Sequence, residues 1–384
     1  MVTTIGLAQI LAWGGSYYLI AVLARPIVTD TGWPFGWVVG GLSLGFLATG
    51  LASPRVGQLI DHYGGRPVLA ASALLLATGQ LVMAAAPALP VFLLSWIIVG
   101  IGMAAGLYDP AFATLGRLYG NEARHPITLT TLFGAFASTV CWPLSAFLVT
   151  HAGWRGACLA YAAINVAIVL PLYWFGVPRE EKAPPPATLH SAAGGTARGS
   201  RLRLAWWLVA GNLTLASVVM TVVSVHMLTL LQARGLAMAA AVGLGALIGP
   251  SQVGARIVEM ALARRRHHPV WTLIVSTVLA AFGLGLMFGG ETLIAVGLVL
   301  YGAGAGIRSI ARGTVPLALF GRDGYATLMG RLARPLMLAQ AASPTLGALL
   351  MSATGAGGTL YVLTAGALLN VLTALPLVAF TRKA

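Results

Sequence analysis

Charged residues are scarce in this chain of 384 residues, and acidic residues are the scarcest. Charged side chains make up 8% of the sequence, against about 25% in ordinary soluble domains. The two cysteines are too few for a disulfide framework or a cysteine zinc site. No glycine-rich phosphate loop follows a strand, which excludes direct use of ATP and a dinucleotide fold. The sequence therefore argues against a soluble enzyme, and we expect no enzymatic activity, no cofactor and no metal.

Long apolar stretches fill most of the chain instead. Hydrophobic residues make up 58% of the sequence, and about 20 consecutive apolar residues are enough to cross a bilayer core. The pattern predicts about twelve membrane-spanning helices, near residues 5–27, 37–56, 68–87, 90–115, 127–150, 156–176, 205–231, 237–260, 270–289, 292–314, 330–352 and 359–380. We therefore predict an all-α membrane protein that is embedded in a lipid bilayer.

The net charge of +14 would indicate a nucleic-acid partner in a soluble protein, but a membrane protein has a simpler explanation. With an even number of spans both termini lie on one side, and most of the 23 Lys and Arg residues fall in segments on that side. Cytoplasmic segments of membrane proteins carry such an excess of basic residues. We therefore predict a multi-pass protein of the bacterial inner membrane with cytoplasmic termini and no nucleic-acid partner.

A polar segment divides the chain into two halves. Residues 178–204 are rich in Pro, Gly, Ser and Arg, a composition that cannot bury itself. We predict that this segment is a flexible cytoplasmic linker between a six-helix half at 1–177 and a second six-helix half at 205–384.

The two halves share short motifs. Gly100-Ile101-Gly102 corresponds to Gly302-Ala303-Gly304, and Gly153 corresponds to Gly355. The offset of about 200 residues is similar at each match, which predicts two parallel structural repeats related by pseudo-symmetry.

The loop of residues 57–66 carries the most specific motif. It reads GQLIDHYGGR, with Gly57, Asp61 and Arg66 at its key positions. Glycine lets another helix approach closely, and Asp61 can accept backbone N–H groups at a helix start and pair with Arg66. We predict a charge clamp at the membrane surface rather than a binding pocket.

This spacing, G-x3-D-x2-G-x-R, resembles the loop between the second and third helices of the major facilitator superfamily (MFS), a class of secondary transporters. The chain departs from the family pattern at His62 and Gly65, where basic residues are usual. The resemblance implies that the two halves rock about a small-molecule site near the membrane midplane. It also implies that the protein works as a monomer.

Polar and aromatic residues within the spans are candidates for the substrate site. For the ionisable residues the reason is that burying a charge inside the membrane costs free energy. Arg308 lies near the middle of the tenth span, and we predict either that it holds an anionic substrate group or that it forms a structural salt bridge. His226 aligns with Tyr17 in the repeat, and Tyr108 and Trp142 complete the predicted substrate-binding set. The alternative for His226 is a structurally satisfied histidine, and the alternative for Tyr17 is a lipid-facing or interfacial ring.

A second set of residues is predicted to act in gating or coupling, together with Gly57, Asp61 and Arg66. Asp109 and Arg312 lie at equivalent depths in opposite halves, so they can pair to close a gate. Asp109 can alternatively carry a proton as the coupling ion. Arg256 and Glu259 lie one turn apart on one helix and can pair along it.

The charge inside the membrane is positive, with three arginines against Asp109 and Glu259, and this predicts a small organic anion as the substrate. Two other functions stay open. The first is efflux of a toxic drug or an arsenite-like metalloid, although Trp96 stands where the drug antiporters of the family have an arginine. The second is a transporter-like sensor that binds its ligand without moving it. The clamp at residues 57–66 favours transport over sensing.

Overall fold

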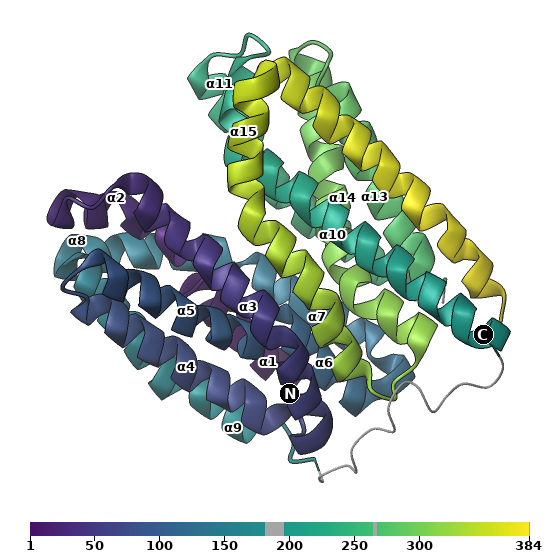
Figure 1. Cartoon of the computed structure of the whole chain (residues 1–384), viewed down its shortest axis with the longest axis horizontal. Coiled ribbons are helices and arrows are strands. Elements are labelled where there is room, and N and C mark those ends of the chain that lie inside the picture. The colour runs from purple at the N-terminus through teal and green to yellow at the C-terminus, as the bar shows by residue number, and fades with distance from the viewer. Residues whose placement is uncertain (181–195, 264–266, 384) are drawn as a thin grey trace. The chain divides into compact units, whose positions relative to one another are not determined.

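The computed structural model describes residues 1–180, 196–263 and 267–383 (Figure 1), and every regular element in these ranges is a helix. Ten helical runs among the described residues are long and apolar enough to cross a membrane. Two of these runs bend at a glycine with positive φ, Gly153 (φ 68°) and Gly355 (φ 67°). Dividing both runs at these glycines gives the twelve spans expected from the sequence. The all-α membrane fold is therefore confirmed.

The chain forms two compact units. The first unit comprises Met1–Leu189 and Arg322–Ala341, and the second comprises His190–Gly321 and Ala342–Ala384. The long helix α15 (Tyr325–Ala374) therefore begins in the first unit and ends in the second. The halves predicted at 1–177 and 205–384 are divided at the polar segment in the sequence and not by contacts, and they stay a prediction.

The first unit holds the helices of the N-terminal part of the chain. They are α1 (Val2–Gly14), α2 (Leu19–Thr31), α3 (Phe35–Tyr63), α4 (Gly65–Ala85), α5 (Leu89–Gly106), α6 (Tyr108–Tyr119), α7 (Arg124–Ala135), α8 (Ala137–Ile164) and α9 (Leu170–Gly176), with the short helices η1 (Gly120–Glu122) and η2 (Asn165–Val169). Within this unit α5 packs against α3 and α4, and α1 packs against α7 and α8.

Two predicted spans of the first unit are interrupted. The span expected at 5–27 is broken by a turn at residues 15–18, which separates α1 from α2. The span expected at 90–115 is broken at Leu107, whose extended backbone (φ −82°, ψ −157°) separates α5 from α6. Pro110 lies just after this second break, and proline removes the N–H that would bond to the carbonyl of Gly106. Both breaks leave backbone groups that need partners inside the protein.

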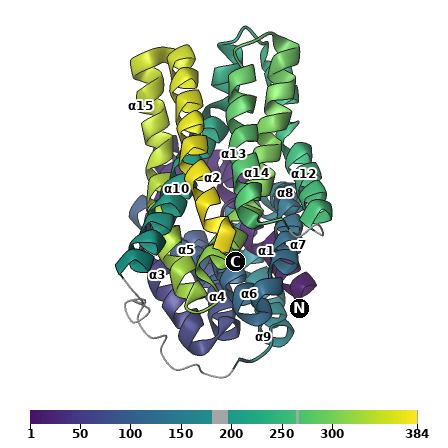
Figure 2. The same ribbon diagram turned by 90° about the vertical axis from the view of Figure 1, so that its right-hand side faces the viewer.

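The second unit holds α10 (Thr196–Gln232), α11 (Met238–Gly245), α12 (Ile248–Ala263), α13 (Pro269–Leu286), α14 (Glu291–Phe320), the rest of α15 and the short helix η3 (Leu375–Lys383). Figure 2 shows α14 between α12 and α13, and both pairs are in contact. Apolar side chains of α10, α13 and α14, including Val223, Leu284 and Leu298, form a buried core in this unit.

The predicted linker at 178–204 is too long at its C-terminal end. Residues 196–204 belong to α10, because leucine, alanine and arginine are good helix formers and extend the helix beyond its apolar part. The rest of the predicted linker at 181–195 lies outside the described residues.

The repeated glycines occupy equivalent places in the two units. A Cβ on Gly100 of α5 would lie 2.2 Å from the carbonyl oxygen of Gly45 on α3, and a Cβ on Gly302 of α14 would lie 2.9 Å from the carbonyl oxygen of Ile248 on α12. Small residues at these positions let the helix backbones approach closely. The predicted repeat is confirmed here, and also at Gly153 and Gly355, which share the same backbone conformation (ψ 176° and 177°).

Candidate functional site

Aromatic side chains gather in the first unit at its two helix breaks. Tyr17 lies in the turn between α1 and α2, with its ring 5.5 Å from that of Trp13. Trp13 also contacts Tyr108, the first residue of α6, at 4.9 Å between ring centroids. Tyr18 connects the group to Trp142 of α8, at 6.1 Å. These five residues are called the aromatic cluster below. The structure brings Tyr17, Tyr108 and Trp142 of the predicted substrate set together in it.

A buried glutamine ties the aromatic cluster to the second helix break. Gln9 is fully buried on α1, and its Nε2 donates a hydrogen bond to the carbonyl of Gly106 at 2.6 Å. Trp13 Nε1 in turn donates to Gln9 Oε1 at 3.0 Å. The carbonyl of Gly106 has lost its helical partner at Pro110, and a buried carbonyl without a partner is costly. Gln9 therefore satisfies this carbonyl and holds the Trp13 ring in place.

A second buried glutamine serves the first helix break in the same way. Gln80 of α4 is fully buried and donates from Nε2 to the carbonyl of Gly15 at 2.6 Å. Asn165 Nδ2 donates to Gln80 Oε1 at 3.0 Å. Side-chain amides from neighbouring helices therefore hold both breaks.

An ionic network surrounds the end of α3. Asp61 is 3% exposed, and its Oδ2 accepts a hydrogen bond from the backbone N–H of Thr327 at 2.7 Å, in the first turn of α15. Arg117 Nη1 lies 3.3 Å from Asp61 Oδ1, and Arg117 Nε donates to Glu180 Oε2 at 2.8 Å. Glu180 Oε1 accepts from the backbone N–H of Gly65 at 3.1 Å. We call these contacts the Asp61 network. The prediction that Asp61 accepts a backbone N–H at a helix start is confirmed.

The predicted pair of Asp61 with Arg66 is wrong. Asp61 pairs with Arg117, and the guanidinium of Arg66 instead lies 4.7 Å from the centre of the Trp174 ring. Arg117 is therefore the partner of Asp61 instead of Arg66. Sequence reasoning missed Arg117 and Glu180, because both lie far from the loop in sequence and count only as cytoplasmic charges in a hydropathy pattern.

Gly57 has the packing role that its position predicts. A Cβ at this position would lie 2.3 Å from the carbonyl oxygen of Ala326 on α15. Gly330 of α15 is equally tight against the carbonyl oxygen of Ser53 on α3, at 2.2 Å. These two glycines bring the backbones of α3 and α15 close enough for Asp61 to reach Thr327.

Arg308 borders an enclosed cavity of about 20 Å³ in the second unit. Its Nε and Nη1 atoms are buried and have no hydrogen-bond partner in the described part of the chain. The polar residues that line the same cavity are Ser276, Thr277, Tyr301 and Asn370. About 10–15 Å³ is enough for one water molecule, so the space beside the guanidinium admits one group of that size. The arrangement suits a carboxylate oxygen or another small anionic atom.

His226 does not join this cavity. It lies on α10 with its Nε2 buried and unpaired among the described residues, and its ring is pressed against Gly347 of α15. The structure therefore places two predicted substrate residues, His226 and Arg308, in the same unit but at separate positions.

Arg256 and Glu259 lie on α12, where each is 6% exposed. Arg256 Nε donates to the carbonyl of Gly306 at 3.1 Å. Glu259 Oε1 accepts from Thr272 Oγ1 at 2.7 Å and lies 3.3 Å from His267 Nε2. These contacts join α12 to α13 and α14, which suits a structural role as well as a gate.

Asp109 lies in the first turn of α6 in the first unit, and Arg312 lies on α14 in the second. An acidic residue is favoured at a helix N-terminus by the helix dipole. The predicted pair of Asp109 and Arg312 would join the two units, and it stays a prediction.

The fold and these residues define a polytopic, all-α membrane protein. The chain belongs to the Major Facilitator Superfamily, whose sequence profile matches residues 5–267. The resemblance found in the loop at 57–66 is therefore confirmed. In structure the chain is similar to the human organic anion transporter MFSD10 (TETRAN), with a TM-score of 0.76, 20% identity and coverage of 97% of this chain and 98% of that one.

Curated relatives match over shorter stretches. The chain is 26% identical to the Transcription regulatory protein OpdE of Pseudomonas aeruginosa over 164 residues, 42% of this chain and 40% of the relative. It is 30% identical to Monocarboxylate transporter 11 of Homo sapiens over 145 residues, 36% of this chain and 30% of the relative. The chain therefore spans less than half the length of these curated relatives.

Proposed function

We propose that this protein is a secondary transporter that moves a small organic anion by alternating access. The observation that carries the proposal is the buried guanidinium of Arg308, which has unpaired donors among the described residues beside an enclosed cavity. An uncompensated charge inside a membrane protein is costly. A carboxylate oxygen of a substrate anion, placed in the cavity beside the guanidinium, supplies the missing charge and a missing acceptor.

The names of two similar proteins support the choice of an anion. One curated relative is a monocarboxylate transporter, and one solved structure of the same fold is an organic anion transporter. Both names agree with a guanidinium site, because arginine binds carboxylates through paired hydrogen bonds. The substrate of the proposal is therefore a carboxylate.

The Asp61 network supplies a gate for this transport cycle. Because α15 begins in the first unit and continues into the second, the bond between Asp61 and Thr327 holds the start of a helix that both units share. Releasing that bond frees the helix start, and restoring it closes the gate. We place the network on the cytoplasmic side, together with both termini, in a bacterial inner membrane, and we take the protein to act as a monomer with protons as the coupling ion.

Uptake into proteoliposomes tests the proposal. Purified protein is reconstituted and uptake of radiolabelled lactate and benzoate is measured for the natural chain, Arg308→Gln and Arg203→Gln. Arg203 is an exposed arginine of α10 and serves as the control for loss of one positive charge. Loss of charge-assisted hydrogen bonds predicts roughly 10- to 100-fold weaker carboxylate binding in Arg308→Gln only. Unchanged binding and uptake in Arg308→Gln would contradict the proposal.

A sensor is the second candidate, and one observation favours it. The relative OpdE is named a transcription regulatory protein, although the match covers 40% of its length. A sensor would bind carboxylate with the same dependence on Arg308 but would show no uptake in proteoliposomes. The binding and uptake measurements therefore separate the two functions.

A further inference from the structure

Arg66 and Trp174 form a cation–π pair at one edge of the first unit. Arg66 lies in the first turn of α4 and Trp174 near the end of α9, and these two helices are in contact. The guanidinium carbon of Arg66 is 4.7 Å from the centre of the indole ring. Within the part of the chain that the structure describes, no carboxylate pairs with Arg66. The ring therefore holds the guanidinium in place, but its charge is left for a partner outside the described chain.

Both residues lie at the ends of membrane-spanning runs. Arg66 directly follows Gly65, where one candidate span begins, and Trp174 is in the last turn of another, which ends at Gly176. Tryptophan is enriched at the membrane–water boundary, where its ring is apolar and its N–H is polar. Arginine at a helix end likewise reaches the boundary with its guanidinium. The pair therefore lies at the depth of the lipid headgroups.

An exposed stripe of α4 leads from this pair along the span. It begins directly after Arg66 and consists of exposed residues three or four positions apart, which therefore share one face of the helix: Pro67, Ala71, Leu74, Thr78 and Leu81. Leu74 and Leu81 are each 48% exposed, and the Thr78 hydroxyl donates to the Leu74 carbonyl at 2.8 Å, so the stripe offers no free donor. This surface suits an acyl chain.

The three features together fit a phospholipid better than a free anion. Arginine binds phosphate through charge-assisted hydrogen bonds. Trp174 is 45% exposed, so its indole N–H can donate to an ester carbonyl below the phosphate. A free phosphate would use the guanidinium alone and leave the stripe of α4 unused. A zwitterionic headgroup carries its own cation, whereas an anionic headgroup brings the net negative charge that Arg66 lacks.

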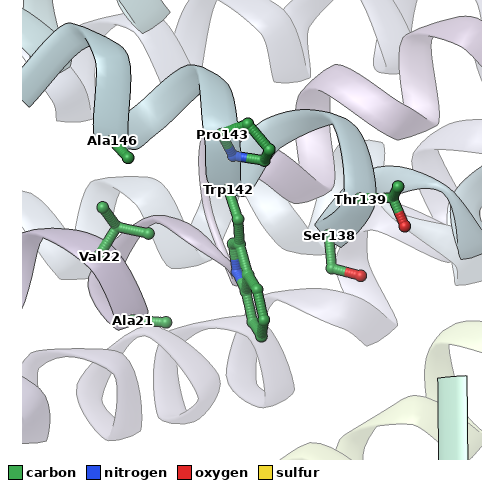
Figure 3. Close-up of a pocket in the computed structure, with 7 residues that line it drawn as sticks. All are labelled: Ala21, Val22, Ser138, Thr139, Trp142, Pro143 and Ala146. Carbon is green, nitrogen blue, oxygen red and sulfur yellow. The ribbon is translucent and has the colours of Figure 1, made fainter. Parts of the chain in front are cut away.

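Exposure of a tryptophan is not enough to make such a site. Trp142 of α8 is 47% exposed, close to the value for Trp174. Figure 3 shows its indole ring in an open surface depression, with α2 on one side and Ser138 and Thr139 nearby. None of the residues that line this depression is charged. The arginine beside the ring is therefore what distinguishes Trp174, and Trp142 provides a matched control.

We propose that Arg66 and Trp174 form a binding site for an anionic phospholipid. Arg66 contacts the phosphate, Trp174 orients the guanidinium and contacts the ester region, and the exposed stripe of α4 carries one acyl chain. The site gives Arg66 a role in place of the predicted pair with Asp61. All of its residues belong to the first unit, and the inference does not depend on which substrate the protein moves.

Two lipids with the same dioleoyl chains test the proposal. The purified full-length protein is stripped of lipid in detergent, and phosphatidylglycerol or phosphatidylcholine is titrated while the thermal unfolding temperature is measured. A ligand that binds only the folded protein raises this temperature. We expect phosphatidylglycerol to act at a concentration at least about 5-fold lower, the advantage of one arginine near a lipid phosphate. Equal effects of the two lipids would overturn the proposal.

Arginine variants separate this site from a general attraction to a basic protein. Arg66→Gln should weaken the effect of phosphatidylglycerol roughly 5-fold and leave that of phosphatidylcholine unchanged. Arg55→Gln is the control, because Arg55 is an exposed arginine of α3 in the same unit. If the two variants lose the preference for phosphatidylglycerol equally, the attraction is diffuse and the proposal is wrong.

Tryptophan variants test the second contact and remain informative if Arg66→Gln fails to fold. Trp174→Leu keeps an apolar side chain but removes the ring and its N–H, so it should weaken the effect of phosphatidylglycerol roughly 2- to 5-fold. Trp142→Leu should have no such effect, and equal losses in the two variants would contradict the site.

A headgroup without chains distinguishes a lipid site from a simple anion site. Glycerol 3-phosphate at the same concentrations should not raise the unfolding temperature, because it cannot contact the stripe of α4. Stabilisation by glycerol 3-phosphate equal to that by phosphatidylglycerol would show that the acyl chain plays no part, and would overturn the assignment to a lipid.

Discussion

Asp61 and Thr327 are far apart in sequence, yet Asp61 Oδ2 accepts the backbone N–H of Thr327 at 2.7 Å. The bond lies at the first turn of α15, where N–H groups have no partner within the helix. A carboxylate at this place satisfies one of them and interacts favourably with the helix dipole. Asp61 is thereby the point at which α3 holds the start of a helix that continues into the second unit.

Asp61→Asn should weaken this attachment. The amide can still accept one hydrogen bond, but the pair with Arg117 at 3.3 Å is lost and a half-buried cation remains. Removing one partner of a buried ion pair costs about 3–5 kcal/mol, and we expect the lower part of this range because Arg117 keeps Glu180. The measurements are the thermal unfolding temperature and the rate of uptake, and both should fall.

Asp323→Asn is the control for Asp61→Asn. Asp323 lies a few residues from Thr327 in the chain and its side chain is fully exposed, so its loss should change neither property. An Asp61→Asn protein with unchanged unfolding temperature and uptake would show that the network is not needed for the gate.

Gly57→Ala tests the close approach of α3 and α15. The added Cβ would meet the carbonyl oxygen of Ala326 at 2.3 Å, and backbone atoms cannot move aside cheaply. Overpacking of this kind costs about 1–3 kcal/mol. Gly40→Ala on the same helix has open space, and it should be neutral or slightly stabilising because alanine is the better helix former. Comparable unfolding temperatures for the two variants would contradict this account.

Gly153→Ala and Gly355→Ala should have similar effects in the two repeats. Both glycines have φ near +68°, and a Cβ added to either would have no neighbouring atom within 4 Å, so the cost is backbone strain alone. Both also have ψ near 180°, and a non-glycine residue in this region costs about 1–3 kcal/mol. Gly243→Ala, at a helical glycine with equally open surroundings, should cost nothing. Chemical denaturation of the three variants checks the prediction, and unequal losses at 153 and 355 would argue against equivalent bends.

Gln80→Met should destabilise the first unit. The substitution nearly conserves volume but leaves the Gly15 carbonyl without its side-chain donor and removes one of the two hydrogen bonds of Asn165 Nδ2. An unsatisfied buried polar group costs about 1–3 kcal/mol. Gln58→Met at an exposed position of α3 is the control. Hydrogen exchange at the turn of residues 15–18 should increase in Gln80→Met alone, and unchanged exchange would show that the amide is not needed to hold the turn.

Much of the fold could be predicted from residues that act locally. Apolar runs long enough for a bilayer determine the spans, and glycines repeated along the chain determine where helices bend or approach closely. Gly153 and Gly355 illustrate this, because only a residue without a Cβ adopts their backbone conformation at no cost. Pro110 likewise indicates a helix break, although hydropathy alone joined α5 and α6 into one span.

The tertiary structure decided which side chains meet. Asp61 and Arg66 are close in sequence, but in the structure Asp61 pairs with Arg117 of α6 and Arg66 lies against the Trp174 ring. Tyr17 comes from the turn between α1 and α2, Tyr108 from α6 and Trp142 from α8. The breaks that bring their rings together depend on Gln9 and Gln80, which reach across to neighbouring helices. Hydropathy and backbone preference act within a few residues, so both can be read directly from the sequence. Contacts between distant residues depend on the rotation of each helix about its axis, and only the packed structure determines that rotation.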